Sequence, residues 1–188
     1  SEGYFDLSGL RKKTPQEVAQ TIRKAIAQRL KITVSEGIGS NKLVSQVASK
    51  LKKPASLIEV PQGHEREFLA PLPNHWLPNV GPKLSAMLKS AGLAFIHDVA
   101  ETPVDMLSLL VGGYGLQLRE YARGIDQRPL VVEKQPAKSY SEQHTFGADV
   151  TEEAVLISQL YKMADNLTGK VREDRHSYRT ITLKLRYN

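Results

Sequence analysis

Two segments near the N-terminus carry apolar residues at helical spacing. In residues 14–31 an apolar side chain recurs every four positions from Val18 to Leu30, after Thr14, a residue type that caps helices. Residues 41–53 also place their apolar side chains on one helical face. The pattern therefore predicts two amphipathic helices, and a proline follows the second and stops it.

Three short segments around these helices have the pattern of strands. Residues 3–9 alternate and end in turn residues, and residues 32–35 and 55–60 are short apolar runs next to turn signals. The order strand, helix, strand, helix, strand predicts an α/β layer. The pattern leaves open whether the connections are parallel or antiparallel.

Prolines separate this part from the middle of the chain. Five of the ten prolines lie in residues 61–82, which predicts a linker or the entrance to another domain. Only short helices are expected from there to about Asp126. Residues 127–139 are extended and polar in pattern, and they predict a second linker.

The last section predicts one strand, helix, strand unit. Residues 139–146 have a strand pattern, residues 151–172 a helical one, and residues 179–187 alternate strictly. In the second of these strands Lys184 and Arg186 face away from the apolar side chains, which predicts a basic row on an open sheet face. Such a unit is too small to stand alone, so we expect the parent protein to continue.

Composition narrows the functional classes. The chain has 188 residues, 40% of them apolar, and no cysteine, which excludes disulfides, cysteine zinc sites and thiol catalysis. No apolar run is long enough for a membrane span, and the N-terminus has no signal-peptide pattern. The five histidines lack metal-ligand spacing, so we interpret them as structural or surface residues. A soluble globular chain of one to three small domains is expected.

The charge balance favours a polyanionic partner. The formal net charge is +6 and the isoelectric point is about 9.5. Residues 1–70 hold 12 Lys and Arg against 7 Asp and Glu, so the excess lies in the N-terminal third.

Residues 77–101 contain a tight turn between two predicted helices. Backbone N–H groups from Gly81 onward are left unpaired at the start of the second helix. With the helix dipole and the charge of Lys83, they form an anion site suited to the phosphates of a nucleic-acid backbone. Such a site contacts no base edge, so it would bind without regard to base sequence. The alternative is that Gly81 and Pro82 only start a helix and that Lys83 is solvated.

A second glycine cluster repeats this pattern. Gly112, Gly113 and Gly115 follow one apolar segment and precede another. Two glycine turns in one small helical region favour a paired clamp on the DNA backbone. Helix packing with glycine caps is the alternative interpretation.

The whole chain resembles a known family. It is similar to the Y family of translesion DNA polymerases, most of all to the bacterial DNA polymerase IV (DinB-like) type, in five blocks of matching order and spacing: SEGYFDLSG, SEGIGSNKLVSQVASKLKKP, LPNVGPKLSAMLKSAGLAFIHDVA, YARGID and KSYSEQHTF. The resemblance implies an α+β, multidomain fold. Residues 1–70 would be the C-terminal part of an α/β palm and residues 71–126 a small all-helical thumb with helix-hairpin-helix motifs. Residues 127–137 would be a linker and residues 138–188 the first half of an α+β little finger.

The resemblance also implies a metal site. The family carries a Ser-x-Asp-Glu-[Ala/Gly]-Tyr block whose Asp and Glu, with an Asp from an N-terminal strand, surround two magnesium ions. Glu2 matches the catalytic, metal-binding glutamate, but Ser1 stands where the aspartate belongs. Two-metal phosphoryl transfer needs several carboxylates, so this chain is expected to be inactive alone. We favour a sequence cut before the acidic pair over a loss of the acids, because the chain also ends within a domain.

Other positions are assigned by the same resemblance. Lys53 matches the lysine that reaches the triphosphate of the incoming nucleotide. Lys42 would have a structural or phosphate-side role, and Asp6 would be structural rather than metal-bound. Asn79 replaces the first glycine of the usual Gly-[Ile/Val]-Gly turn, and asparagine tolerates left-handed backbone angles. DNA contacts are assigned to Val80, Gly81, Lys83, Gly113, Gly115, Lys184 and Arg186.

These assignments predict a fragment of a template-directed, error-prone translesion DNA polymerase. It would bind primer–template DNA through backbone contacts, and the full-length enzyme would add deoxynucleoside triphosphates by two-magnesium (Mg2+) phosphoryl transfer. A sliding clamp would bind outside this sequence, no membrane would be involved, and the location would be the bacterial cytoplasm at the nucleoid. Two alternatives stay open: a catalytically inactive, polymerase-derived DNA-binding accessory protein for damage-induced mutagenesis, and a helical protein-interaction module.

Overall fold

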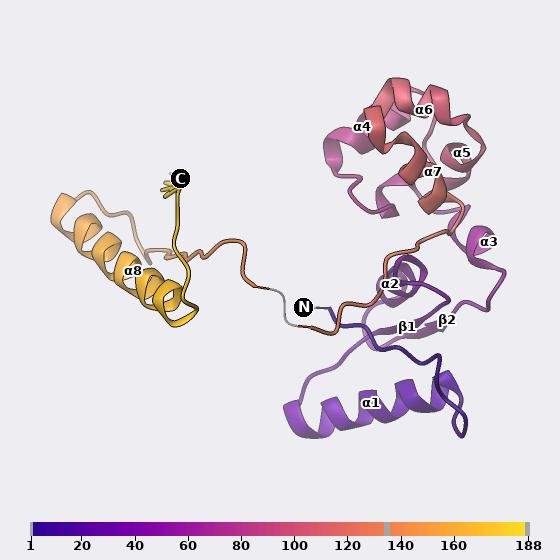
Figure 1. Cartoon of the computed structure of the whole chain (residues 1–188), viewed down its shortest axis with the longest axis horizontal. Coiled ribbons are helices and arrows are strands. Elements are labelled where there is room, and N and C mark those ends of the chain that lie inside the picture. The colour runs from indigo at the N-terminus through magenta and orange to yellow at the C-terminus, as the bar shows by residue number, and fades with distance from the viewer. Residues whose placement is uncertain (1, 134–135, 187–188) are drawn as a thin grey trace. The chain divides into compact units, whose positions relative to one another are not determined.

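The computed structural model describes residues 2–133 and 136–186. It divides into two units, Ser1–Leu130 and Val131–Asn188. The elements in chain order (Figure 1) are α1 (Pro15–Leu30), β1 (Glu36–Ile38), α2 (Lys42–Leu51), β2 (Leu57–Glu59), α3 (Glu65–Leu69), the 3-10 helix η1 (Asn74–Trp76), α4 (Pro82–Ser90), α5 (Ile96–Glu101), α6 (Val104–Val111), the 3-10 helix η2 (Gly112–Tyr114), α7 (Gly115–Ala122) and α8 (Glu153–Glu173). Helices and a small sheet together confirm the α+β class.

Both helices predicted near the N-terminus are confirmed. At the start of α1 the Thr14 hydroxyl accepts the Glu17 amide at 3.2 Å, and the Glu17 carboxylate accepts the Thr14 amide at 2.7 Å. This reciprocal cap pairs two amides that the helix itself leaves free. At the start of α2 the Asn41 side chain accepts the Val44 amide at 3.0 Å. Local capping chemistry thus fixes where both helices begin.

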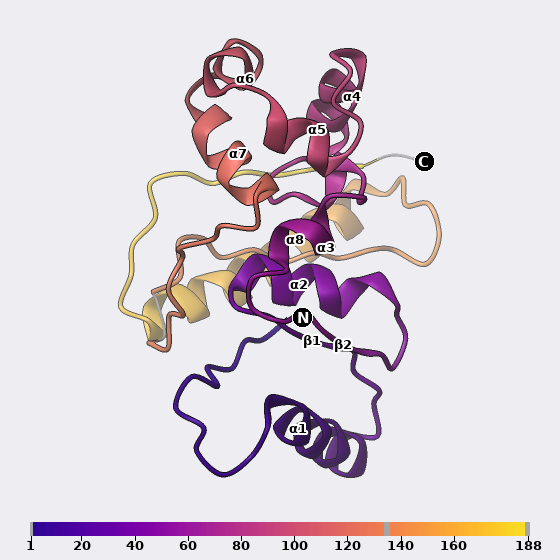
Figure 2. The same ribbon diagram turned by 90° about the vertical axis from the view of Figure 1, so that its right-hand side faces the viewer.

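Strands β1 and β2 form a parallel two-stranded sheet, with Glu36 opposite Leu57. In both views the sheet lies between α1 and α2 (Figures 1 and 2). A Cβ added to Gly37 would collide with the carbonyl oxygen of Ser45, so glycine at this position lets α2 pack closely on β1. The parallel connection resolves the direction that the sequence pattern left open.

The strand predicted at residues 32–35 is wrong in position, because β1 begins four residues later. Its ladder starts where the Glu36 amide donates to the Ser56 carbonyl, at 2.8 Å. Ile32, counted as a strand residue, is 54% exposed. The glycine-containing segment forms the strand because it can approach α2, whereas the apolar residues before it have no neighbouring strand. The strand predicted at 55–60 is confirmed as β2.

Three further predicted strands are wrong within the part of the chain that the structure describes. Residues 3–9, 139–146 and 179–186 pair with no strand there. An alternating segment becomes a strand only where another strand supplies its hydrogen-bond partners, and alternation alone does not supply them. The last position of the predicted C-terminal strand, Tyr187, lies outside the described residues.

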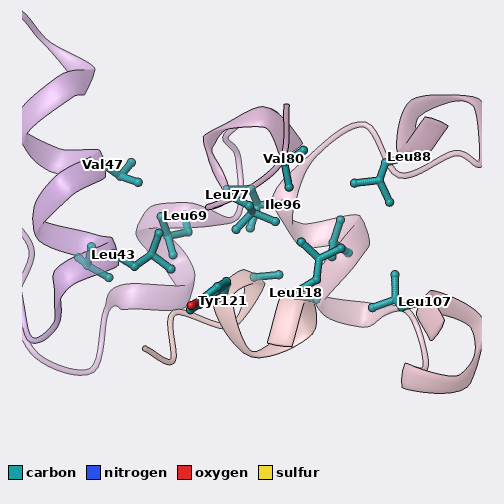
Figure 3. Packing of buried hydrophobic residues seen from close by; sticks show 14 of the residues in the cluster. Leu43, Val47, Leu69, Leu77, Val80, Leu88, Ile96, Leu107, Leu118 and Tyr121 are labelled. Atoms are coloured by element: carbon teal, nitrogen blue, oxygen red, sulfur yellow. The ribbon is translucent and has the colours of Figure 1, made fainter. Parts of the chain in front are cut away.

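The proline-rich segment 61–82 is folded rather than an open linker. It contains α3 and η1, and Leu69, Leu77 and Val80 are buried in the main core. In Figure 3 these side chains lie between Leu43 of α2 on one side and Leu88 of α4 on the other, with Leu118 of α7 beside them. Prolines lie at the ends of short elements, since Pro73 precedes η1 and Pro82 begins α4, while the apolar residues between them join the core. The short helices predicted after this segment are present as α4 to α7.

The second unit is built on α8, which confirms the helix predicted at 151–172. Its Val171 is buried at 6% exposure. The segment before the helix lies against it, because the Tyr140 hydroxyl donates to Asp174 at 2.7 Å and the Asn166 amide donates to Glu142 at 2.9 Å. In the described part of the chain, neither α8 nor any other helix has the length and apolarity needed to cross a membrane.

Candidate nucleic-acid interface

The first glycine turn connects η1 to α4. The Leu77 amide donates to the Asn74 carbonyl at 3.0 Å, and the Val80 amide donates to the Leu77 carbonyl at 3.2 Å. Between them Asn79 adopts a φ of +58°, in the left-handed region that glycine and asparagine tolerate best. The turn therefore persists with asparagine at this position, as predicted.

Backbone amides at the start of α4 are free for a ligand. Among the hydrogen bonds of the described residues, none uses the amides of Gly81, Lys83 or Leu84, and Pro82 has no N–H. The first paired amide is that of Ser85, which donates to the Gly81 carbonyl at 2.9 Å. The Lys83 side chain is exposed beside these amides. Free donors, the positive end of a helix and a cation together make an anion site.

Two of the residues assigned to DNA contact are buried. The Val80 side chain is 6% exposed and belongs to the core. Gly115 is also buried, and a Cβ there would lie 2.7 Å from the Ser108 amide nitrogen. The exposed members of the predicted set around the two turns are Gly81, Lys83 and Gly113.

A buried polar pair holds η1 to α4. Asn74 is fully buried, and its side-chain amide donates to the Leu93 carbonyl at 2.7 Å. The Ser85 hydroxyl donates to the Asn74 side-chain oxygen at 2.6 Å. Buried polar groups that are satisfied in this way fix one geometry, since any shift leaves one of them unpaired. No sequence pattern indicated a role for Asn74, because it lies in a segment with the composition of a linker.

The second glycine turn runs from α6 to α7 through η2. Gly112 ends α6 with a φ of +64°, which strains any residue with a side chain. Gly113 is exposed, and no atom lies within 4 Å of a Cβ added there. Gly115 starts α7 against α6. Glycines therefore serve two purposes here, a left-handed backbone at the turn and close helix packing after it.

Tyr114 joins the two turns. Its hydroxyl donates to the Pro78 carbonyl at 2.5 Å, across 36 positions of sequence. Burial raises the pKa of Tyr114 to about 12, while a hydrogen bond with the Asn79 side chain opposes that rise. The hydroxyl is therefore protonated and able to donate at neutral pH. No pattern in the sequence identified Tyr114 as a functional residue, although it lies between two glycines.

Glu2 and Lys53 lie in one charged group at the C-terminal end of α2. Lys50 Nζ is 2.8 Å from Glu2 Oε1, and Gln46 donates to Glu2 Oε2 at 2.6 Å. The hydrogen bond with Lys50, followed by that with Gln46, holds the pKa of Glu2 below its ordinary value, and the charge of Lys53 adds to this. The structure thus places the two predicted residues near each other, and it adds Lys50, which the sequence analysis had not singled out.

The carboxylates of the described residues do not form a magnesium site by themselves. In the described part of the chain, no three His, Cys, Asp or Glu side chains are grouped so that they could hold a metal ion. The Glu2 carboxylate is already bound to an ammonium group and an amide, and Asp6 accepts the amide of Ser8 at 2.8 Å. Ser1 lies outside the described residues. A single carboxylate does not provide the oxygen ligands that magnesium requires.

The start of α2 is tied to the segment that follows α7. Asp126, whose side chain is fully buried, accepts the Leu43 amide at 3.0 Å. Arg128 binds both oxygens of the same carboxylate, at 2.8 and 2.7 Å. Lys42 donates to the Pro129 carbonyl at 3.2 Å, which gives it a structural contact. The roles of Asp126 and Arg128 could not be predicted from the sequence. Leu43, which donates to Asp126, is 83 positions away, and the Asp126–Arg128 pair belongs to no recognisable motif.

In the second unit Lys184 and Arg186 are exposed. The apolar residues that alternate with them are exposed too, from 55% for Leu183 to 81% for Ile181. The predicted sheet face is therefore not formed in the described residues. No ion pair of the described structure uses either cation, so both are free for an anionic partner.

Both ends of the chain match one class of protein. The model of the impB/mucB/samB family matches residues 1–50, and that of the impB/mucB/samB family C-terminal domain matches residues 137–188. Similar proteins include DNA polymerase IV of Opitutus terrae, 42% identical over 99% of this chain and 48% of its own, and DNA polymerase IV of Dehalococcoides mccartyi, 31% identical over 99% and 48%. DNA polymerase IV 2 of Methanosarcina mazei is 36% identical over 90% of this chain and 46% of its own.

The chain belongs to the impB/mucB/samB family, the Y family of DNA polymerases that its sequence blocks indicate. It spans about half the length of the curated relatives it matches.

Proposed function

We propose that this chain is part of a template-directed, error-prone translesion DNA polymerase, and that it supplies part of the grip on primer–template DNA. The names of its relatives support the polymerase class. An enzyme that copies damaged templates needs a tolerant active site, so its affinity for DNA must come from contacts with the backbone. The turns and exposed cations of this chain suit that role.

One observation carries the proposal. The first turn presents the free amides of Gly81, Lys83 and Leu84 together with the Lys83 ammonium group, and a hydrogen bond links it to the second turn at Tyr114. Amides and a lysine recognise phosphate oxygens and ignore base edges. Two linked turns would therefore bind successive phosphates of one strand without regard to sequence.

The proposed domains of the polymerase follow one another along the chain. Residues 1–70 would belong to the palm, residues 71–126 would form the thumb, residues 127–137 the linker and residues 138–188 part of the little finger. Lys53 would meet the triphosphate of the incoming deoxynucleotide, since it lies beside the exposed end of α2. Lys184 and Arg186 would bind phosphates of the duplex.

The chemistry would belong to the whole protein. Mg2+, when bound there, would activate the primer hydroxyl and neutralise the leaving pyrophosphate. Glu2 would be one of its ligands, and the other carboxylates would come from outside this sequence. A sliding clamp would likewise bind elsewhere in the protein, which would act on the bacterial chromosome in the cytoplasm. The accessory-protein alternative gains no support, because each relative named above is a DNA polymerase IV.

Fluorescence anisotropy with a labelled primer–template duplex tests the proposal. If about three phosphates are contacted, the affinity should fall roughly 40-fold between 50 and 200 mM salt, whatever the duplex sequence. A Lys83→Glu and Lys184→Glu double variant should bind more weakly and with a shallower salt dependence.

Lys89→Glu is the matched control. Lys89 is exposed at the opposite end of α4, so the variant has the same charge change on the same helix but away from the turn. Equal losses for Lys83→Glu and Lys89→Glu would reduce the effect to net charge and contradict a site at the turn. Absence of binding at 50 mM by the folded chain would contradict the proposed grip on DNA and favour a protein-interaction module.

A further inference from the structure

Tyr114 contacts the first turn at its most constrained point. Its hydroxyl donates to the Pro78 carbonyl at 2.5 Å and is hydrogen-bonded to the side chain of Asn79. Asn79 is the residue with the left-handed backbone, φ +58°, and it occupies the place where glycine would adopt that geometry without strain. One side chain from η2 therefore holds both residues that determine the direction of the chain into α4.

The direction of this turn decides where the free amides point. Gly81, Lys83 and Leu84 lie two to five positions after Asn79, and the first amide paired in the helix is that of Ser85. A small rotation at the Pro78–Asn79 peptide would redirect these donors, because hydrogen bonds to an anion depend steeply on angle. The Tyr114 hydroxyl opposes such a rotation, since it binds the Pro78 carbonyl and the Asn79 side chain together.

Tyr114 is itself held firmly. The left-handed Gly112 sets the direction of η2, and Gly115 packs against Ser108 of α6 with no room for a side chain. The Tyr114 ring is partly buried against the main core. The hydroxyl is thus presented by the second turn at a fixed place relative to the first.

We propose that Tyr114 is a positioning residue that sets the geometry of the 78–84 turn for a phosphodiester group and makes the two turns one binding unit. The proposal rests on the proposed function of the turns in binding DNA. Tyr114 does not touch the phosphate; it acts through Pro78 and Asn79. The aromatic ring alone would serve packing equally well, so the hydroxyl is the part that carries this role.

Tyr114→Phe separates the two roles, because it keeps the ring and removes the hydroxyl. The variant should bind the primer–template duplex about fivefold more weakly, the effect of one hydrogen bond. In a Lys83→Glu background, where the first turn is already disabled, the same substitution should change the affinity less than about twofold. In a Lys184→Glu background the fivefold loss should persist, because that contact lies in the other unit. Equal losses in both backgrounds would overturn the proposal.

A measurement without DNA keeps the inference independent of the proposed function. Amide NMR of the full chain should show shifted resonances at residues 79–84 in Tyr114→Phe, and hydrogen exchange should be faster at Val80, whose amide donates to Leu77, with the amides of α2 unchanged. Unchanged amides at residues 79–84 would overturn the positioning role, whatever the DNA measurement gives. If the unmodified chain fails to bind DNA while these amides do shift, the proposed function fails and the positioning of the turn by Tyr114 stands.

Discussion

The Asp126 carboxylate accepts the backbone amide of Leu43 at 3.0 Å, across 83 positions of sequence. This bond places a buried acidic side chain at the N-terminus of α2, where the helix dipole stabilises a negative charge. Arg128 neutralises the same carboxylate and lies 5.2 Å from the centre of the Tyr121 ring. The helix that ends near Lys53 is thus anchored at its start to the segment that leaves α7.

Asp126→Ala should destabilise the first unit by about 2 kcal/mol. The substitution leaves the Leu43 amide without its acceptor and Arg128 without its ion-pair partner. Urea unfolding, followed by circular dichroism, measures the change. Asp105→Ala, which removes an exposed carboxylate from α6, should change the free energy of unfolding by about 0.5 kcal/mol or less. Similar effects of the two substitutions would show that the buried carboxylate does not anchor α2.

The stability of the first unit should fall at low pH in a way that depends on Asp126. Burial alone would raise the pKa of Asp126, but the hydrogen bonds from Arg128 and Leu43 bring it below its ordinary value. A lowered pKa in the folded state means that the contribution is complete above the unfolded value, about 3.9, and is lost as the pH falls below it. The free energy of unfolding between pH 5 and pH 2.5 should therefore drop less in Asp126→Asn than in the unmodified chain. Parallel curves would contradict this assignment.

The elements that could be predicted from sequence are those whose determinants are local. The capping residues Thr14 and Glu17 are three positions apart, and the apolar spacing of α1, α2 and α8 repeats within one or two helical turns. The left-handed Asn79 could be predicted for the same reason, because the conformational tolerance of asparagine is a property of the residue itself.

The remaining features depend on partners that sequence pattern does not reveal. Residues 3–9 and 179–186 alternate like strands, but a strand also needs a neighbour. The pairs Asp126–Leu43 and Tyr114–Pro78 join segments 83 and 36 positions apart, and neither has a repeating pattern. Lys53 and Glu2 were found through family resemblance, whereas the Lys50 that binds Glu2 was not.

Glu2→Gln should strengthen the binding of inorganic triphosphate near the end of α2. Glu2 is paired with Lys50 at 2.8 Å, so loss of the Glu2 charge frees a second cation three positions before Lys53 in the sequence. Because the pair is partly exposed, the gain should be about threefold. Titration calorimetry at low salt measures it. Glu67→Gln removes the same charge from an exposed position of α3 and serves as the control.

Lys53→Ala should weaken the same binding in both the unmodified chain and Glu2→Gln, because Lys53 is proposed to meet the triphosphate directly. An affinity that rises equally in Glu2→Gln and Glu67→Gln would show that only net charge matters. An affinity unaffected by Lys53→Ala would place the anion elsewhere.

Gly115→Ala should destabilise the first unit by about 1 to 3 kcal/mol, whereas Gly113→Ala should be nearly neutral. The two glycines are separated by one residue in the second turn, yet their surroundings differ. A Cβ at position 115 would lie 2.7 Å from the Ser108 amide nitrogen, and backbone cannot move aside as a flexible side chain can. A Cβ at position 113 has no atom within 4 Å.

Thermal and urea unfolding of both variants test this difference. If α6 and α7 separate to admit the methyl group, the Tyr114 hydroxyl moves with α7, so Gly115→Ala should also weaken binding of the primer–template duplex. Gly113→Ala should leave both the stability and the binding close to those of the unmodified chain. Equal stability of the two variants would mean that α6 and α7 do not approach each other as closely as the contact at Ser108 requires. If Gly115→Ala lowers the stability but not the affinity for DNA, the geometry of the first turn does not depend on how α7 packs against α6.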